Sequence, residues 1–151
     1  MSITQSLEWS SCGNATYAAP FNGGYNAQVH THYYTTTVAL MEDALVNEGY
    51  TSTGDAGWAF TTQNPATYDD LFTISETERE EAIANGYVFE NIAAYVYATQ
   101  ICSSIPLYRL YQPVLHDHFY TIDPTEVHTT ATTQNYVEEG IACYVLPDPT
   151  D

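Results

Sequence analysis

Two histidine pairs are the first residues of this chain whose spacing points to chemistry. His30 and His32 form one HxH pair, and His116 and His118 form a second. Side chains at positions i and i+2 of a strand face the same side, so either pair has the spacing to bind one metal ion. The corresponding segment in the middle of the chain, Tyr68–Asp70, lacks these histidines. We therefore favour a structural, hydrogen-bonding role for the imidazoles, and we expect neither a metal nor a cofactor.

Acidic side chains are the second candidate chemistry, because the chain has 19 of them. A glycosidase needs two carboxyl groups about 5–10 Å apart across a cleft. The acids of segment 76–81 instead have the spacing of a solvated helix face. The chain also lacks the GxSxG, P-loop, GxGxxG and HExxH motifs. We expect no catalytic residue, and a glycoside hydrolase with an acidic pair stands as a second alternative.

Aromatic side chains are the third candidate chemistry, with 14 tyrosines and two tryptophans. Many of them must build the core, but a tyrosine or tryptophan ring can also stack on the apolar face of a sugar. The formal net charge is −17 and the chain has no lysine. Such a surface repels phosphate and anionic lipid but tolerates a neutral, hydroxyl-rich ligand. We expect glycans as partners, with no nucleic acid and no membrane insertion.

Length and cysteine content bound the setting of the protein. A chain of 151 residues suits a single domain, residues 1–151. No signal peptide is visible, but the acidic, Tyr- and Thr-rich composition suits a secreted protein, with a cytoplasmic one as the alternative. Three cysteines without a CxxC motif do not favour a zinc site. We expect one disulfide, with Cys12–Cys102 as the first candidate pair, and a buried thiol at Cys143.

Three segments of the chain align with one another, and they define the elements that must position these residues. The segments "VHTHYYTT", "TYDDLFTI" and "LHDHFYTI" share an aromatic followed by Thr. Each is followed by a helix-forming stretch, a "GY" or "NY" pair and, eight residues after that Tyr, another aromatic. The aligned aromatics are Tyr34, Phe72 and Tyr120 in the first position, and Trp58, Tyr95 and Tyr144 in the last.

Local chemistry predicts the element order of each unit. The aromatic and β-branched stretches favour strands. A helix then begins at an N-cap, with Asp123 and Glu126 as a capping box around Pro124, and Ser75 with Glu78 as another. The helices end at Gly49, Gly86 and Asn135, residue types that accept a left-handed C-cap.

The alignment predicts an α+β fold of three tandem units, each a β-hairpin, a short helix and a strand. The units span about residues 20–60, 61–97 and 106–146. They are too short to fold alone, so we expect a pseudo-threefold arrangement around one core, with mostly antiparallel strands.

The third unit resembles a known family. Its segments "PLYRLYQPVLHDHFYT" and "GIACYV" are similar to a fungal and bacterial tandem-repeat family with the signature PLYRLYNP…GDHFYTT…GYxYEGIAxYV. That family occurs in secreted proteins, often beside glycan-active modules, and is catalogued as a repeat of unknown function. The resemblance implies the repeated fold and a secreted, glycan-associated, fungal setting, and it assigns no activity.

We therefore expect a non-catalytic, lectin-like carbohydrate-binding protein, with up to three related sites. The alternative is a secreted structural or interaction protein, an effector or inhibitor without a glycan site. Arg109 is expected to pair with a nearby acid, and Trp58 is the first candidate for stacking on a sugar. The candidate ligand-binding residues lie before and on the "FYT" strands and at this tryptophan: His30, His32, Tyr34, Trp58, Tyr68, Asp69, Asp70, Asp117, His118 and Tyr120.

Overall fold

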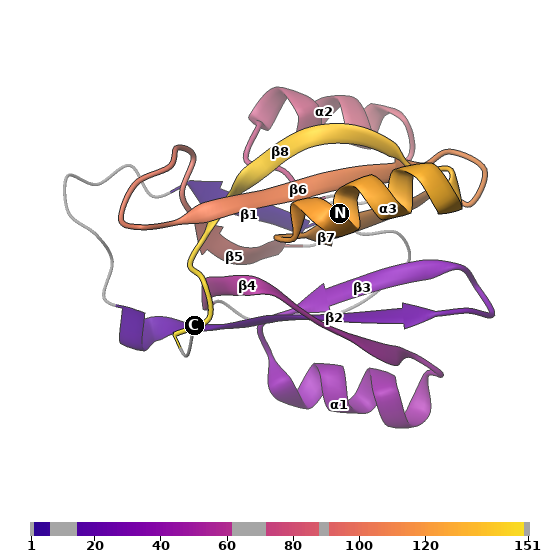
Figure 1. Ribbon diagram of the computed structural model, residues 1–151, viewed down its shortest axis with the longest axis horizontal. Coiled ribbons are helices and arrows are strands. Elements are labelled where there is room, and N and C mark those ends of the chain that lie inside the picture. Colours follow the sequence, from indigo (N-terminus) through magenta and orange to yellow (C-terminus); the bar gives the residue numbers. More distant parts are fainter. Residues whose placement is uncertain (1, 7–14, 62–71, 88–90, 150–151) are drawn as a thin grey trace.

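The computed structural model describes residues 2–6, 15–61, 72–87 and 91–149. Eight strands form two sheets, and three α-helices lie outside them (Figure 1). The helices are α1 (Val38–Asn47), α2 (Glu76–Ala84) and α3 (Pro124–Gln134), with a 3-10 turn η1 (Ala15–Tyr17). The strands are β1 (Ser2–Ser6), β2 (Ala18–Asn26), β3 (Thr31–Thr35), β4 (Thr51–Thr61), β5 (Asn91–Val96), β6 (Ile105–Gln112), β7 (Asp117–Thr121) and β8 (Val137–Val145).

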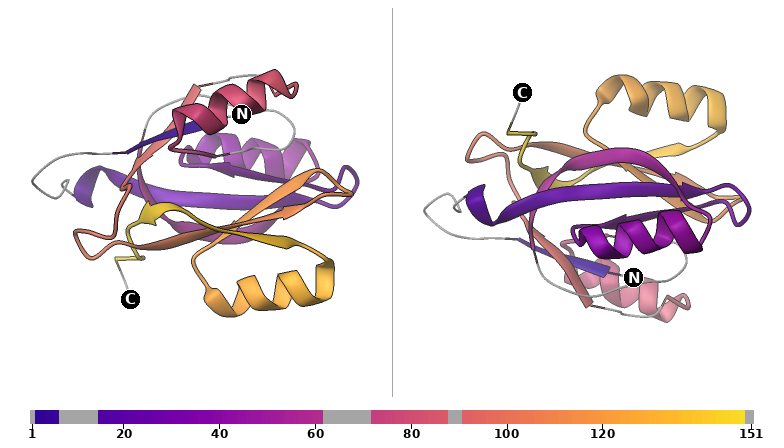
Figure 2. Two further views of the ribbon diagram at one scale, coloured as in Figure 1. Left: turned by 90° about the horizontal axis from the view of Figure 1, so that it is seen from above. Right: turned by 90° about the horizontal axis from the view of Figure 1, so that it is seen from below.

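The two sheets confirm an α+β fold with mostly antiparallel strands. One sheet has the order β1-β5-β4-β2-β3 and the other the order β7-β6-β8. The pairing of β1 with β5 is parallel, and β1 was not predicted. Figure 2 shows α1 and α3 on opposite outer sides of the fold, each beside the hairpin that precedes it. The two hairpins, β2–β3 and β6–β7, therefore face one another across the interior.

The two hairpins and their following strands have the same register. Tyr34 and Tyr120 lie 86 residues apart, and the same shift converts every pairing of β2 with β3 and β4, except that of Ala18 with Phe60, into one of β6 with β7 and β8. Both units contain the same bulge, where Gly54 (φ 91°) and Gly140 (φ 90°) adopt a positive φ that favours glycine. The residues beside them, Thr53 and Glu139, are therefore placed alike.

The helix ends follow the predicted capping chemistry in part. Asp123 accepts a hydrogen bond from the N–H of Thr125 at 2.8 Å, and Ser75 accepts one from the N–H of Glu78 at 3.2 Å. The capping box also predicts that the Glu126 side chain accepts the N–H of Asp123, and this prediction is wrong. The Glu126 carboxylate accepts a hydrogen bond from the Thr121 hydroxyl at 2.6 Å, because that same hydroxyl already accepts the N–H of Asp123. Glu126 is thus held at the start of α3 and remains exposed.

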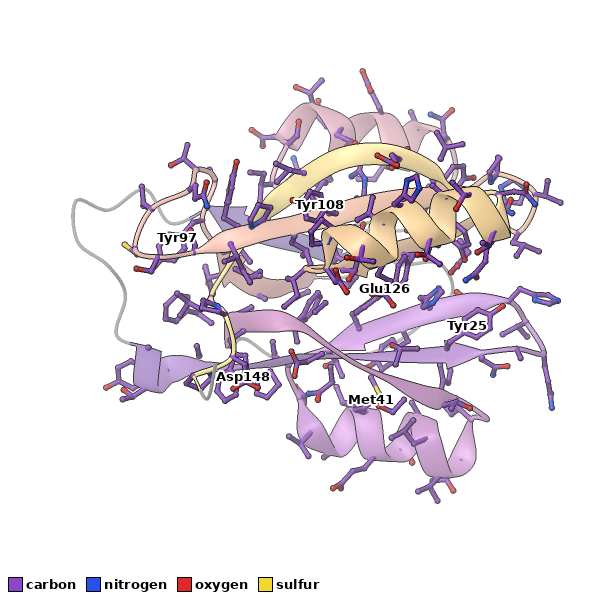
Figure 3. The ribbon with its side chains drawn as sticks, in the orientation of Figure 1. Tyr25, Met41, Tyr97, Tyr108, Glu126 and Asp148 are labelled. Atoms are coloured by element: carbon purple, nitrogen blue, oxygen red, sulfur yellow. The ribbon has the colours of Figure 1, made fainter. Side chains whose placement is uncertain are left out.

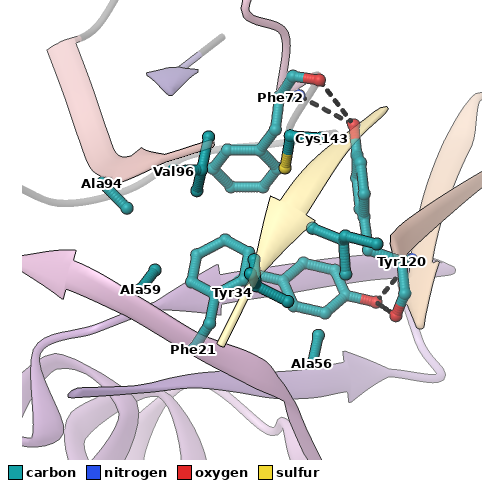
Figure 4. Close-up of a cluster of buried hydrophobic side chains, with 11 residues drawn as sticks. Phe21, Tyr34, Ala56, Ala59, Phe72, Ala94, Val96, Tyr120 and Cys143 are labelled. Carbon is teal, nitrogen blue, oxygen red and sulfur yellow. Dashed lines mark hydrogen bonds between the residues drawn. The ribbon is translucent and has the colours of Figure 1, made fainter. Parts of the chain in front are cut away.

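The core lies between the sheets and centres on three aromatic rings. Tyr34, Phe72 and Tyr120 pack edge to face, with ring centroids 5.3–6.1 Å apart. The Tyr34 hydroxyl bonds the backbone of Tyr120, and the Tyr120 hydroxyl bonds the backbone of Phe72 (Figure 4). Cys143 is a free thiol buried in the same cluster, as predicted.

Three strand ends pair with one another at the other end of the core. β4 pairs with β5, the chain after β5 bridges β8, and the chain after β8 bridges β4. The pairs are Phe60 with Tyr95, Tyr97 with Tyr144, and Trp58 with Leu146. Segments far apart in sequence are joined here by backbone hydrogen bonds of 2.8–2.9 Å.

Cys102 forms a disulfide. The candidate partner Cys12 lies outside the described residues. Across the part of the chain that the structure describes, none of the helices has the length and apolar character that a membrane crossing requires.

Candidate functional site

A pocket of about 190 Å³ lies where the β2–β3 hairpin meets the unit that consists of β6, β7, α3 and β8, which we call the α3 unit. We call it the junction pocket. Its walls come from segments on both sides of the interior, so neither unit forms it alone. Figure 3 shows Tyr25 on the β2–β3 hairpin and Glu126 beneath α3. The lining residues are Tyr25, His32, Thr53, Phe119, Glu126, Thr130, Gln134 and Tyr136.

Asp117 fixes two of the lining residues from behind the pocket. Its side chain is fully buried, with 0% exposure. One carboxylate oxygen accepts the N–H of His32 at 2.7 Å, and the other contacts His32 Nδ1 at 2.7 Å and accepts the Tyr136 hydroxyl. All of this hydrogen bonding is within the protein, so Asp117 orients the imidazole and the phenol and is not exposed to a ligand.

Burial and Asp117 also keep the two tyrosines protonated. Burial raises the pKa of Tyr136, and the hydrogen bond and charge of Asp117 raise it further. Burial raises the pKa of Tyr25, with a further contribution from the charge of Asp117. Both phenols are therefore neutral at physiological pH.

The pocket combines aromatic faces with uncharged and acidic polar groups. Phe119 and Tyr136 are buried, and Tyr25 is partly exposed. Glu126 and Gln134 are exposed, while Thr130 is buried beside them. Rings, a carboxylate, an amide and hydroxyls are the groups that hold a small polar ligand with an apolar face.

The corresponding position between the α3 unit and α2 is occupied by an arginine side chain. Arg109 stands 86 residues after Gly23, and its guanidinium donates to Glu78 at 2.7 and 3.2 Å and to Glu139 at 2.7 Å. It also donates to the carbonyl of Phe72 at 3.4 Å. The expected pairing of Arg109 with nearby acids is confirmed.

Arg109 and His118 lower the pKa values of the two carboxyl groups. Hydrogen bonding from Arg109 holds the pKa of Glu78 below its usual range against the opposing effect of burial. Hydrogen bonding from His118 and the charge of Arg109 lower the pKa of Glu139. Both carboxylates are therefore ionised at neutral pH.

Several predicted ligand-binding residues lie in the core instead. Tyr34 and Tyr120 are 4% and 2% exposed, and Asp117 is not exposed at all. His118 is 7% exposed and lies 3.5 Å from Glu139. These four side chains have almost no surface on which a sugar could stack, because all four are buried. Tyr68, Asp69 and Asp70 lie outside the described residues.

The two histidines of each HxH pair contact different partners. His30 is exposed, has a positive φ of 55° and lies 3.2 Å from the Tyr25 hydroxyl, whereas His32 contacts Asp117. His116 repeats the first arrangement with the Tyr111 hydroxyl at 2.9 Å. Within the described residues no group of three or more His, Cys, Asp or Glu side chains is placed to hold a metal.

Trp58 and His32 are the predicted residues with partial exposure. His32 lines the junction pocket, with 10% of its side chain exposed. Trp58 lies instead at the strand-end pairing, and its buried indole N–H finds no hydrogen-bond partner among the described residues.

Most pocket residues were missed by sequence reasoning. Tyr136 was noted only as the tyrosine after a helix, and Glu126 only as a capping residue. Their alignment with Tyr87 and Glu78 was visible, but an alignment within one chain does not tell which units dock or how. No local signal marks Tyr25 or Thr53, which reach the pocket only through the sheet register.

Comparison with known proteins identifies the family. Residues 20–146 match the model of a family described as a domain of unknown function (DUF5648), and the chain belongs to that family. No curated protein matches the chain. No solved structure matches it either.

Proposed function

We propose that this member of the DUF5648 family is a secreted, non-catalytic carbohydrate-binding protein and that the junction pocket is its sugar site. The observation that supports this most is the composition of the pocket wall. Tyr25 is partly exposed and offers a ring face, buried Phe119 adds an apolar wall, and Glu126 and Gln134 offer a carboxylate and an amide at the rim. Sugars combine an apolar ring face with a circle of hydroxyl groups, and such a wall matches both features.

The size of the pocket favours a single sugar ring. Its volume of about 190 Å³ is smaller than the roughly 300–1,000 Å³ of pockets that hold drug-sized molecules. A terminal or branch residue of a glycan would enter, and the rest of the chain would remain outside. A shallow, single-ring contact of this kind gives modest affinity, which glycan-binding proteins raise by multivalency.

We also propose that the three aligned units form a closed ring with threefold character. In sequence, Trp58, Tyr95 and Tyr144 align. The residue two positions after each of these aromatics pairs with the aligned aromatic of the next unit. The pairs are Phe60 with Tyr95, Tyr97 with Tyr144, and Leu146 with Trp58. The last pair joins the third unit to the first, so the pairing closes on itself. The mutually edge-to-face rings of Tyr34, Phe72 and Tyr120 support the same arrangement. A crystal structure with a different set of strand-end pairs would contradict it.

The ring does not make three equal sugar sites. Arg109 fills the space between the α3 unit and α2 that corresponds to the junction pocket. Residues 62–71 of the second unit lie outside the described residues. We therefore propose one sugar site in the described part of each chain, in place of three.

Secretion is supported by the disulfide of Cys102, since disulfides persist mainly in oxidising compartments. The acidic surface, with a net charge of −17, fits an extracellular protein that must stay soluble.

A glycan array probed with the purified protein tests the function. We expect binding to glycans that share one exposed residue, and a loss of at least about tenfold on Tyr25→Ala, because the stacking face is removed. The matched control is Tyr17→Ala, at a tyrosine that is 72% exposed and outside the pocket, which should leave binding unchanged. Absence of binding across neutral, acidic and basic glycans, with a protein partner recovered instead, would favour the interaction-protein alternative.

A further inference from the structure

The junction pocket and the site of Arg109 are two versions of one position in the fold. Glu126 and Glu78 both lie in the first turn of their helices, and each is hydrogen-bonded by a threonine that precedes its helix, Thr121 or Thr73. Thr53 and Glu139 lie beside the corresponding bulge glycines. The hairpin register is the same on one side of both junctions, and the helix-start glutamate is bonded to a threonine on the other, so we compare the side chains between them.

One side chain makes the main difference. Between the α3 unit and α2, the guanidinium of Arg109 lies against Glu78 and Glu139. In the first unit the corresponding residue is Gly23. Its missing side chain leaves the carboxylate of Glu126 without the cation that Glu78 has. This space therefore belongs to the junction pocket, whereas at the other junction the ion pair of Arg109 fills it.

The chain has no other arginine or lysine to place beside Glu126. Its two basic residues are Arg79, which pairs with Glu76 and Glu80, and Arg109. There is no lysine. Buried Asp117 adds a second negative group behind the pocket wall. A carboxylate at the rim of an aromatic-lined pocket favours a cationic ligand, through both the charge and the ring faces.

We propose that the junction pocket recognises a protonated amino group, and therefore that the sugar it takes is an amino sugar that is not N-acetylated. This inference rests on the sugar-binding function proposed above. The ammonium would contact Glu126, in the place where Arg109 contacts Glu78. The ring would lie on Tyr25, with its hydroxyls near Gln134 and Thr130.

Matched oligosaccharides test the proposal. A short glucosamine oligomer and its fully N-acetylated counterpart share one backbone and differ in charge. Titration calorimetry should show the glucosamine oligomer binding at least about tenfold more tightly, as expected for one charge-assisted hydrogen bond. Contacts between ligand protons and the ring protons of Tyr25 and Phe119, measured by NMR, should locate the ligand in the pocket.

The net charge of −17 attracts any cation, so a charge-matched control is essential. Glu126→Gln removes the carboxylate but keeps an acceptor for Thr121, so α3 should stay folded. Glu42→Gln removes one charge from an exposed position on α1. We expect Glu126→Gln to lose about tenfold in affinity and Glu42→Gln less than about twofold. Equal losses in the two variants would show only general attraction and would overturn the proposal.

Three further outcomes would also overturn it. Equal binding of both oligomers, unaffected by Glu126→Gln, would leave the sugar function standing and remove the amino group from it. Binding of N-methylguanidine but of neither oligomer, with the same dependence on Glu126, would replace the sugar by an arginine side chain of a protein partner. Absence of binding by all three probes would overturn this inference, and the glycan array would then decide whether the sugar function stands.

Discussion

The hydroxyl of Tyr34 donates to the carbonyl oxygen of Tyr120 at 3.1 Å and accepts the backbone N–H of the same residue at 2.9 Å. One phenol thus satisfies both backbone groups of a residue in the opposite sheet. Tyr34→Phe keeps the ring and leaves these two buried groups unpaired, which should cost about 1–3 kcal/mol in the free energy of unfolding. Urea denaturation measures it, and Tyr17→Phe, at an exposed tyrosine, is the control.

Asp117→Asn should destabilise the protein more than Tyr34→Phe. The amide would face His32 Nδ1 and the Tyr136 hydroxyl with an N–H₂ group where a carboxylate oxygen now lies. We expect a loss of about 3 kcal/mol, because the site is fully buried and the hydrogen bonds are made to a charged acceptor. Tyr136→Phe removes one of these bonds and should cost less. Equal stability of Asp117→Asn and the wild type in thermal unfolding would contradict the structural role given to this carboxylate.

The protein should lose stability in acid partly through Glu78 and Glu139. The pKa of each carboxyl is lower in the folded chain than its ordinary value. Their contribution is therefore complete above the ordinary carboxyl range, about pH 4–5, and is lost as the pH falls through the lowered values.

Glu78→Gln should flatten this part of the pH–stability curve. It should also cost on the order of 1 kcal/mol at pH 7, a modest figure because the Glu78 side chain is 36% exposed. Glu76 forms an exposed ion pair with Arg79, so Glu76→Gln should leave the curve nearly unchanged. Parallel curves for the wild type and Glu78→Gln between pH 3 and 7 would be inconsistent with the Arg109 pairing.

The thiol of Cys143 should be inert in the folded protein. Burial raises its pKa to about 12, and the side chain is 3% exposed. The reactive thiolate is therefore scarce at neutral pH, and reagents cannot reach the sulfur. We expect iodoacetamide to label Cys143 only after denaturant is added, as read by mass spectrometry. Rapid labelling under native conditions would show that this part of the core opens readily.

Introducing the Arg109–Glu139 pair at the corresponding positions of the first unit should close the junction pocket. At Gly23 an added Cβ would come within 2.6 Å of the Thr53 hydroxyl, so Gly23→Arg alone should be poorly tolerated. The double variant Gly23→Arg/Thr53→Glu copies Arg109 and Glu139, and we expect it to fold and to lose ligand binding, because the new guanidinium occupies the pocket beside Glu126. Thermal unfolding and the oligosaccharide titration check both halves. A double variant that folds and still binds would place the ligand elsewhere.

The prediction of elements from sequence was successful where the cause is local. Asp123 and Ser75 cap helices, and Asn135 and Gly49 adopt positive φ at helix ends, because these effects depend on neighbours in the chain. The aligned aromatics did identify residues that meet. They were assigned to ligand binding, however, and Tyr34 and Tyr120 instead close the core.

The pocket was not predictable for a physical reason. Its walls come from residues between 25 and 53 and residues between 119 and 136, whose proximity depends on how one hairpin docks on another. Arg109 illustrates the limit. A carboxylate partner was expected from charge alone, but the identity of Glu78 follows only from the place of α2 in the fold. Likewise the importance of Gly23 is visible only when its position is compared with that of Arg109.

The backbone bridge between Trp58 and Leu146 also sets an order of events during synthesis. Trp58 is made early, yet the N–H and C=O that it presents are satisfied by a residue translated 88 positions later (146 − 58 = 88). Until that segment leaves the ribosome, this flank of β4 has no partner and can pair with strands of other nascent chains. Rapid completion of the chain, or a chaperone that covers β4, would limit such pairing.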